Sequence, residues 1–289
     1  ILGKASGWSM DTDLSDADAS FIGEDFYDMS GCAVSGAGDV NGDDYDDFLI
    51  GAYYDEDGGE GAGQTYLILG KSSGWSMDTD LSDADASFIG ESDYDYSGFA
   101  VSGVGDVNGD DYDDFIIGAY ENDDGGSGSG QTYLMLGKAS GWSMDTDLSD
   151  ADASFIGEDS NDYSGRAVSG AGDVDNDGYD DFLIGAYGND DGGYDTGQTY
   201  LILGKSTGWV MDTDLSVASA SFRGEEVYDR SGRAVSGAGD VDNDGYDDFL
   251  IGAYDNDDGG SGSGQTYLML RRDTLRHAVG SVSISANGE

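Results

Sequence analysis

A repeat of 67 residues runs through this chain of 289 residues and restricts its fold more than any other feature. Four copies cover residues 1–270, and residues 271–289 match none of them. Units of this length usually cannot bury their apolar faces alone, so they stack on one another in arrays. The shared motif Gly-Asp-Val-(Asn/Asp) begins at Gly38, Gly105, Gly172 and Gly239.

Each repeat contains four short segments, A to D, that alternate with Gly- and Asp-rich turns, as expected for strands. In the first repeat we predict strands A, B and C at 33–36, 48–52 and 65–69, and a preceding strand D at 19–22 with its next copy at 86–89. Segments B and C are apolar nearly throughout, which is typical of strands covered on both faces. The fold class predicted is all-β, a β-propeller of four-stranded blades. A β-solenoid is the alternative, but its coils are shorter.

The phase of the repeat suggests how the predicted propeller closes. The first segment D precedes every A, B and C, whereas the last A, B and C (234–270) have no D after them. Pairing of 19–22 with 266–270 would close four blades within one chain through an N-terminal outer strand. A fragment of a longer array, or two chains that share an eight-bladed ring, are the alternatives. A monomer is therefore predicted, with a dimer as the alternative.

A nine-residue acidic loop joins segments A and B in every repeat, with the pattern D-x-[DN]-x-D-[DG]-Y-x-D at 39–47, 106–114, 173–181 and 240–248. Oxygen donors at positions 1, 3 and 5, a backbone carbonyl at position 7 and a carboxylate at position 9 form an all-oxygen set that suits Ca²⁺. An acidic turn without metal is the alternative. About four Ca²⁺ ions, one per repeat, are predicted. The predicted ligands are Asp39, Asn41, Asp43, Tyr45, Asp47, Asp106, Asn108, Asp110, Tyr112, Asp114, Asp173, Asp175, Asp177, Tyr179, Asp181, Asp240, Asp242, Asp244, Tyr246 and Asp248.

The four loops differ in ways that predict a ranking of affinity. The third and fourth loops carry four carboxylates each, whereas Asn41 and Asn108 replace one carboxylate in the first two. The sixth position is Gly178 or Gly245 in the third and fourth loops and Asp in the others. Glycine adopts a left-handed conformation more readily than Asp, so both features predict tighter binding in the third and fourth loops.

The charge balance excludes several classes of partner. The chain has 61 acidic and 11 basic residues, for a net charge of −50. Nucleic acids and anionic membranes attract basic surfaces, so neither is predicted as a partner. No apolar run reaches the length of a membrane span, so direct insertion into a membrane is not predicted either. Like charges at this density instead favour bound cations or a salty medium.

These motifs resemble the FG-GAP repeats of the integrin α-subunit propeller and of its bacterial and archaeal relatives. The Gly-rich segment A, the acidic loop and Gly-Ala-Tyr after segment B carry the resemblance, although the family usually has Gly-Ala-Pro there and Phe-Gly where Ser30-Gly31 stands. The resemblance implies a calcium-binding module, extracellular or at the cell surface, that recognises a protein or glycan. Integrin propellers have seven blades and bind calcium in only some, so neither number carries over.

Two other functions remain open, a structural spacer in a large repetitive surface protein and a non-catalytic accessory domain of a secreted hydrolase or lyase. No enzyme is predicted, because the repeats contain no His and no paired nucleophile and base. Further acidic clusters after segment B and before segment D are expected to be solvated surface, with extra cations as the alternative. One repeat position varies between blades and could carry specificity for a partner: Cys32, Phe99, Arg166 and Arg233. Another is always tryptophan and is expected to pack between blades, with stacking on sugars as the alternative: Trp8, Trp75, Trp142 and Trp209.

Overall fold

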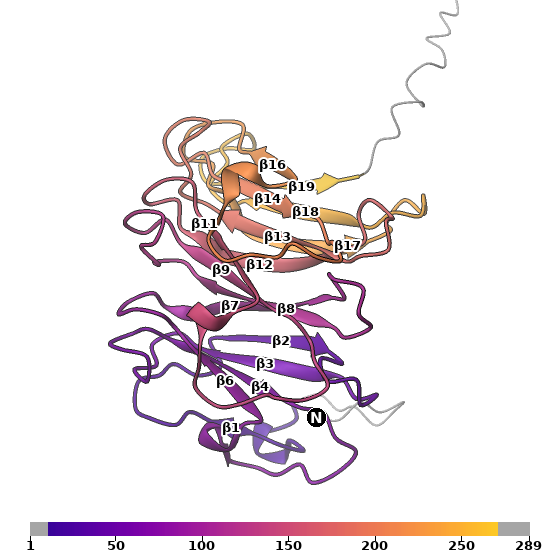
Figure 1. The fold of residues 1–289 in the computed structure, drawn as a ribbon. Coiled ribbons are helices and arrows are strands. Elements are labelled where there is room, and N and C mark those ends of the chain that lie inside the picture. The colour runs from indigo at the N-terminus through magenta and orange to yellow at the C-terminus, as the bar shows by residue number, and fades with distance from the viewer. Residues whose placement is uncertain (1–10, 271–289) are drawn as a thin grey trace, which may run out of the picture.

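The repeats fold into a stack of antiparallel sheets in the computed structural model, which describes residues 11–270. Each sheet is one blade, and its strands lie in the order A, B, C, D from the inside outwards (Figure 1). Blade 1 consists of β2 (Ala33–Gly38), β3 (Asp47–Ala52), β4 (Gln64–Ile68) and β6 (Ala86–Ile89). Blade 2 consists of β7 (Ser97–Gly105), β8 (Asp114–Ala119), β9 (Gln131–Met135) and β11 (Ala153–Ile156). Blade 3 consists of β12 (Ser164–Gly172), β13 (Asp181–Ala186), β14 (Gln198–Ile202) and β16 (Ala220–Arg223).

Blade 4 has three strands, β17 (Ser231–Gly239), β18 (Asp248–Ala253) and β19 (Gln265–Met269). A lone outer strand, β1 (Phe21–Ile22), precedes blade 1. The prediction of all-β, repeated four-stranded sheets is therefore confirmed for the first three blades. Predicted strand D at 86–89 matches β6 residue for residue, and the predicted A, B and C strands of the first repeat differ from β2, β3 and β4 by one or two residues at their ends.

The predicted closure of four blades within one chain is wrong in this structure. Strand β1 pairs with β5 (Thr79–Asp80) instead of with 266–270, and among the described residues β19 pairs only with β18. Figure 1 shows β1 and β19 at opposite ends of the stack. The pairing of β1 with β5 does not itself prevent closure, because β6 pairs with β10 (Thr146–Asp147) as well as with β4, and β11 pairs with β15 (Thr213–Asp214) as well as with β9. The stacking of the blades keeps the two ends apart.

Four single-turn 3₁₀ helices precede the outer strands, and three of them directly follow the two-residue strands β5, β10 and β15. The sequence pattern did not predict these turns. Each begins after an Asp whose carboxylate accepts a hydrogen bond from the Ser two residues on, which satisfies a donor at the start of the turn. In three of the four turns the leading Leu is fully buried. The turns are η1 (Leu14–Asp16), η2 (Leu81–Asp83), η3 (Leu148–Asp150) and η4 (Leu215–Val217).

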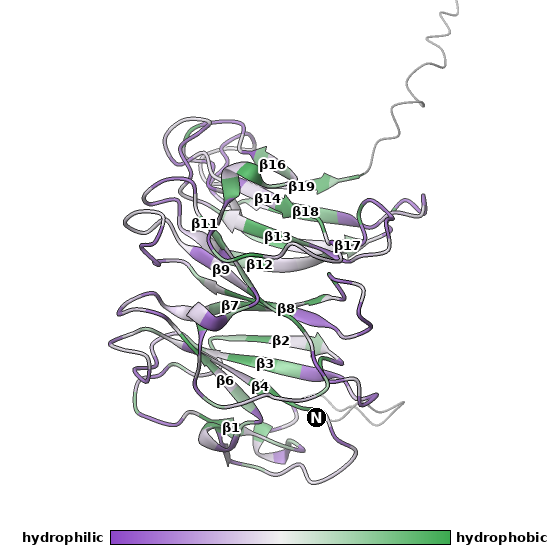
Figure 2. Ribbon diagram, in the orientation of Figure 1, coloured by the Kyte–Doolittle hydropathy of each residue, from purple (hydrophilic) through white to green (hydrophobic). Residues whose placement is uncertain are grey.

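The apolar core lies between the blades. Strands B carry green segments with paler or purple residues beside them in Figure 2, and β3 and β4 of blade 1 are buried along nearly their whole length, as expected for strands covered on both faces. One aromatic group of two phenylalanines and a tryptophan occurs three times among the described residues: Phe21 of β1 packs edge-on against Phe48 of blade 1, with Trp75 beside both rings. Trp142 and Trp209 lie in equivalent groups. The prediction that these tryptophans pack between blades is confirmed, while Trp8 lies outside the described residues.

Candidate metal centres and the surface that carries them

The acidic loop between strands A and B curls around its first aspartate. In blade 1, Asp39 Oδ1 accepts hydrogen bonds from the backbone N–H groups of Gly42 (2.7 Å) and Asp43 (3.0 Å). Its Oδ2 accepts from the N–H of Asp44 at 2.8 Å. Asp106, Asp173 and Asp240 organise the other three loops in the same way. The side chain at position 1 therefore fixes the loop in the tight curl that the sequence pattern predicted.

Two positions of every loop, the fourth and the sixth, adopt left-handed backbone conformations. The sequence pattern indicated a left-handed residue only at the sixth position. Each loop has one glycine in this pair: Gly42 (φ 74°) precedes Asp44 (φ 70°) in the first loop, whereas Asn176 (φ 59°) precedes Gly178 (φ 94°) in the third. The second loop follows the first and the fourth follows the third. Every loop therefore has one glycine and one other residue in the left-handed region, so the backbone strain is similar in all four loops. Only the number of carboxylates still supports the predicted ranking of calcium affinity.

Positions 1, 3 and 5 converge in the third and fourth loops. One carboxylate oxygen from each of Asp173, Asp175 and Asp177 lies within 4.8 Å of the others, and Asp240, Asp242 and Asp244 form the same arrangement. In the first and second loops Asn41 and Asn108 take position 3, so these loops contribute two carboxylates and one amide oxygen there. Clustered carboxylates repel one another, and a hard cation such as Ca²⁺ would neutralise them. The residues present thus fit a calcium ion.

The ninth position behaves differently from the others. Asp47 is 1 % exposed, its Oδ2 accepts from the N–H of Val40 (3.0 Å) and its Oδ1 from the N–H of Gly70 (2.6 Å). The equivalents Asp114 and Asp181 make the same pair of bonds. This carboxylate therefore ties the loop to strand C. The carboxylate at the ninth position was predicted as the ligand that closes the metal site. It remains a candidate ligand, but it also has this structural role.

Burial at the ninth position also raises the pKa of the carboxyl group. Desolvation, followed by the repulsion of the loop's other aspartates, raises the pKa of Asp47 to about 6 and of Asp114 and Asp181 to about 7, against two backbone hydrogen bonds that lower it. A cation among these carboxylates would favour the charged form and reverse the shift. The loops are therefore electrostatically costly without a cation.

The eighth position carries a role that the sequence analysis missed. Asp113 of the second loop accepts a hydrogen bond from the backbone N–H of Asp39 in the first loop (Oδ2, 2.8 Å). Asp180 and Asp247 accept in the same way from the backbone N–H groups of Asp106 and Asp173 in the loops that precede theirs, at 3.0 and 3.1 Å. The signal was present in the sequence, because the Asp-Asp pair that ends the loop occurs in all four copies. The loops thus form a chain in which each one braces its neighbour.

Calcium titration of the full chain should resolve two tighter and two weaker sites. Asp177→Ala is expected to remove one tighter site and Asp110→Ala one weaker site, because only the third and fourth loops place three carboxylates together. Each lost carboxylate is expected to weaken its site by about tenfold or more. Isothermal titration calorimetry in 0.15 M NaCl measures both. Four equal sites, or loss of a tighter site in Asp110→Ala, would contradict the ranking.

A second acidic group lies behind strand B, where the repeats differ at one buried position. In blade 2, Asn122 donates through Nδ2 to Asp95 Oδ2 at 3.2 Å, and blades 3 and 4 repeat this bond. In blade 1 the amide is replaced by Asp55, which is 3 % exposed and lies beside buried Asp28. Tyr66 Oη donates to Asp55 at 3.1 Å. Burial first, and the charge of Asp28 among the other causes, raises the pKa of Asp55 to about 6.

Asp55→Asn is therefore expected to stabilise the protein at pH 7.5. The folded state holds the Asp55 proton more tightly than the unfolded chain. The contribution of the Asp55 side chain to the free energy of unfolding is therefore full below about pH 4 and is lost as the pH rises to about 6. An amide in its place would restore the bond that the other blades make, and we expect a gain of about 1–3 kcal/mol at pH 7.5 that shrinks below pH 6.

Urea unfolding at pH 4.5 and 7.5 with calcium present measures this difference. Asn122→Asp in blade 2 is the matched reverse variant and should lose a similar amount at pH 7.5. A loss of stability in Asp55→Asn would instead show that a bound cation neutralises this group.

Comparison with known proteins assigns the family. Three segments match the model of the FG-GAP repeat, at residues 97–135, 164–202 and 231–269. Integrin alpha-V of Gallus gallus is 30% identical over 259 residues, which is 87% of this chain and 22% of that protein. Integrin alpha-PS2 of Drosophila melanogaster is 30% identical over 227 residues, 76% of this chain and 15% of that protein. The chain is therefore an FG-GAP repeat protein related to integrin alpha subunits.

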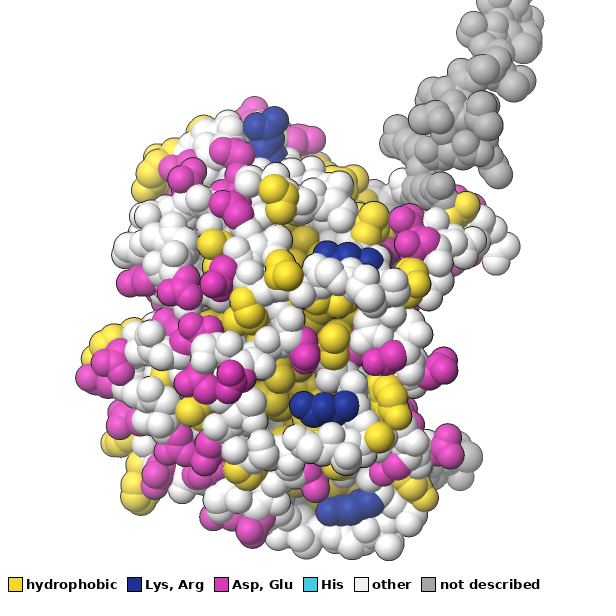
Figure 3. Space-filling view, viewed as in Figure 1, with side chains coloured by type: hydrophobic (Ala, Val, Ile, Leu, Met, Phe, Trp, Pro, Cys, Tyr) yellow, Lys and Arg dark blue, Asp and Glu magenta, His cyan; other side chains and the backbone are white. Residues whose placement is uncertain are grey.

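The matches cover only part of the relatives, since this chain spans about a fifth of their length. The relatives are integrin alpha subunits, and none of their names describes an enzyme, in line with the prediction of no catalytic activity. Among the described residues, no helix is long and apolar enough to cross a membrane. Figure 3 shows acidic side chains scattered over one whole face with only a few basic ones, as the composition predicted.

Proposed function

We propose that this chain is a calcium-stabilised β-propeller module that acts in recognition of a protein or glycan outside the cell or at its surface. The observation that carries the calcium part is the convergence of three carboxylates in each of two loops, Asp173 to Asp177 and Asp240 to Asp244. The same loop occurs in all four blades and braces its neighbours. About four ions per chain, one in each loop, would then stabilise the stack.

A variable aromatic surface supports the recognition part. The guanidinium of Arg166 lies 3.7 Å from the ring centre of Phe99 and 5.2 Å from that of Tyr120. Arg233 lies in the same way beside Tyr187 and Tyr254. These arginines occupy a repeat position that varies between blades, where the first repeat has the exposed Cys32. Aromatic residues and arginine are enriched where proteins bind partners, so this surface is the candidate recognition face.

Binding of the full chain to panels of matrix proteins and glycans, with calcium and with EDTA, tests the proposal. Calcium-dependent binding that is lost in Arg166→Ala supports recognition through this face. The exposed Val217→Ala serves as the control, because Val217 lies in η4, outside the aromatic surface. Binding to no member of either panel would favour the structural spacer, and binding only to a hydrolase or lyase substrate would favour the accessory domain.

A further inference from the structure

A buried glutamine at the start of strand C in blade 2 lacks a partner for its amide oxygen. Gln131 is fully buried, and its Nε2 donates to Asp212 Oδ1 at 3.3 Å. Its Oε1 is buried as well and accepts no hydrogen bond from any of the described residues. A buried acceptor without a donor costs stability, so this oxygen calls for a ligand that the chain itself does not supply.

The same atom is unpartnered in the neighbouring blades. In blade 3, Gln198 donates through Nε2 to Glu158 Oε1 at 3.3 Å, and its own Oε1 is buried without a partner among the described residues. In blade 1, Gln64 is fully buried, and neither its Nε2 nor its Oε1 has a partner in the part of the chain that the structure describes. The unpartnered oxygen is therefore a property of the repeat and not of one blade.

The amide of Gln131 faces acidic side chains. Side chains alternate along a strand, so Gln131 and Tyr133 point to the same face of β9. Burial first, and then the charge of Glu91, raises the pKa of the Tyr133 hydroxyl, which places Glu91 on that face. Asp212 lies there too, held by the amide of Gln131 and by Ser154 Oγ, which donates to Asp212 Oδ1 at 3.1 Å.

Three carboxylates from three segments of the chain surround this amide. Glu91 follows strand D of blade 1, Asp124 lies in the loop after strand B of blade 2, and Asp212 precedes β15. Burial, followed by the charge of Asp124, raises the pKa of Glu91, and burial, followed by the charge of Asp212, raises the pKa of Asp124. Gln131 is fully buried and Glu91 half-buried, whereas Asp124 and Asp212 are exposed. The group therefore opens to solvent on the side of the two aspartates.

Acceptors outnumber donors in this group. Glu91, Asp124, Asp212 and the amide oxygen of Gln131 all accept, and the ion pairs of the described residues belong to Arg230 instead. A water molecule would donate to the amide oxygen but would leave three negative charges uncompensated. A hard divalent cation satisfies both needs. Ca²⁺ binds carboxylate and amide oxygens in flexible geometry, whereas Mg²⁺ demands a near-ideal octahedron.

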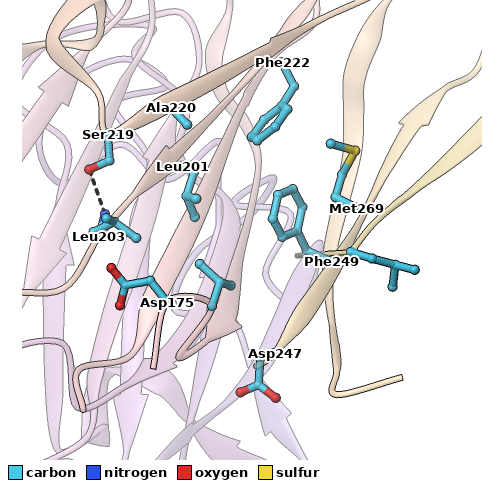
Figure 4. Close-up of a pocket in the computed structure, with 11 residues that line it drawn as sticks. Asp175, Leu201, Leu203, Ser219, Ala220, Phe222, Asp247, Phe249 and Met269 are labelled. Carbon is cyan, nitrogen blue, oxygen red and sulfur yellow. Dashed lines mark hydrogen bonds between the residues drawn. The ribbon is translucent and has the colours of Figure 1, made fainter. Parts of the chain in front are cut away.

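Other hollows of the molecule do not combine these groups. Among the described residues, three carboxylates within 4.8 Å of one another occur only in the third and fourth acidic loops, so here the amide oxygen is needed to complete the set. A pocket of about 280 Å³ between blades 3 and 4 is lined mainly by apolar side chains such as Phe222 and Phe249 (Figure 4). Its carboxylates, Asp175 and Asp247, come from the acidic loops, and no amide side chain lines it.

We propose that Gln131 Oε1 and the carboxylates of Glu91, Asp124 and Asp212 bind a calcium ion that joins blades 1, 2 and 3. This site is separate from the acidic loop of blade 2, because that loop precedes β8 and Asp124 follows it. The sequence pattern favoured solvated surface for the acidic clusters after segment B and before segment D. It did not include the buried glutamine, which comes from strand C.

Blade 1 repeats the whole set. Its ligands would be Gln64, Glu24, Asp57 and Asp145. Glu24 Oε1 is buried without a partner among the described residues, like the oxygen of Gln64. Burial and then the charge of Asp57, with that of Asp145 among the further causes, raises the pKa of Glu24 to about 7, so these groups lie near one another as they do in blade 2.

Equilibrium dialysis of the full chain against calcium in 0.15 M NaCl counts the bound ions. The wild type is expected to bind about six per chain, four in the acidic loops and two in these sites. Gln131→Met fills the same space without the oxygen, and Glu91→Gln removes one charge at a half-buried position. Each variant is expected to bind about one ion fewer than the wild type, because the site holds few other ligands.

Two further variants of the same strand are the controls. Thr132 is fully buried and its Oγ1 also lacks a partner among the described residues, but it faces Gly165 of blade 3. Thr132→Val should therefore keep every ion. Gln131→Glu keeps an oxygen at the site, so it should retain the ion and unfold in calcium at a urea concentration no lower than the wild type. Without an ion, a fourth carboxylate buried there would destabilise the protein.

The loop variant Asp110→Ala separates these sites from the acidic loops. Its lost ion and that of Gln131→Met should add in the double variant. If Asp110→Ala loses no ion while Gln131→Met loses one, the proposed role of the loops fails and this site stands. An unchanged count in both Gln131→Met and Glu91→Gln would overturn the proposal, and displacement of the ion by an equal concentration of magnesium would overturn its assignment to calcium.

Discussion

Chelation of calcium at low ionic strength is expected to abolish the cooperative unfolding transition of this protein. The third and fourth loops each bring three carboxylates together, and Asp114 and Asp181, at the ninth position of the second and third loops, are buried. At a free calcium concentration a hundred times the dissociation constant, each site stabilises the fold by about 2.7 kcal/mol. Four such sites amount to about 11 kcal/mol, which is comparable with the whole stability of a typical domain. Circular dichroism during heating, with 5 mM calcium and with excess EGTA, measures the effect.

Two controls separate calcium from general screening. Magnesium in place of calcium should restore little, because it demands a tighter octahedral set of ligands. Sodium chloride at 1 M without calcium shortens the screening length to about 3 Å and should recover part of the stability but not all of it. An unchanged melting curve in EGTA at low salt would show that the acidic loops are ordinary turns.

Gly118→Ala is expected to cost about 3 kcal/mol of stability, because its new Cβ would overlap the carbonyl oxygen of Gly165 in the neighbouring blade. The strand β8 and the strand β12 of blade 3 cannot separate without breaking the packing of their whole junction. For a domain of this size such a loss corresponds to a fall in melting temperature of about 6–12 °C. Thermal unfolding with saturating calcium measures it.

Gly252→Ala is the matched control, since this residue holds the same position in blade 4 and a Cβ there would meet nothing closer than 3.5 Å. At a concentration where the protein is monomeric, its stability should change by less than about 0.5 kcal/mol. Equal losses in the two variants would mean that the strand itself, rather than the approach of the next blade, requires glycine.

Local structure in this protein could be predicted because it depends on short-range patterns that occur four times. The apolar segments B and C predicted β3 and β4, and the Asp-rich loop predicted a curled turn around Asp39. The tryptophans were expected to pack between blades, and Trp75, Trp142 and Trp209 do so. Each of these features is decided by residues within one repeat or by a neighbour that has the same sequence.

Other features depend on contacts between repeats, which no single repeat reveals. The sequence showed the Asp-Asp pair at the end of each loop, but only the structure shows that Asp113 bonds to the preceding loop. The sequence shows that glycine stands at the fourth position in two loops and at the sixth in the other two. Only the backbone angles show that both positions are left-handed in every loop.

The prediction from the sequence and the structure differ on whether the first outer strand pairs with the last blade. The sequence by itself determined that one outer segment D precedes the first A, B and C, because the phase of the repeat can be counted directly from its motifs. Only the tertiary structure decided that this outer segment and the last blade do not meet: the rotation from one blade to the next is set by packing such as Phe21 against Phe48. Small angles add over the whole stack, and side-chain packing, not the order of residues, fixes their sum.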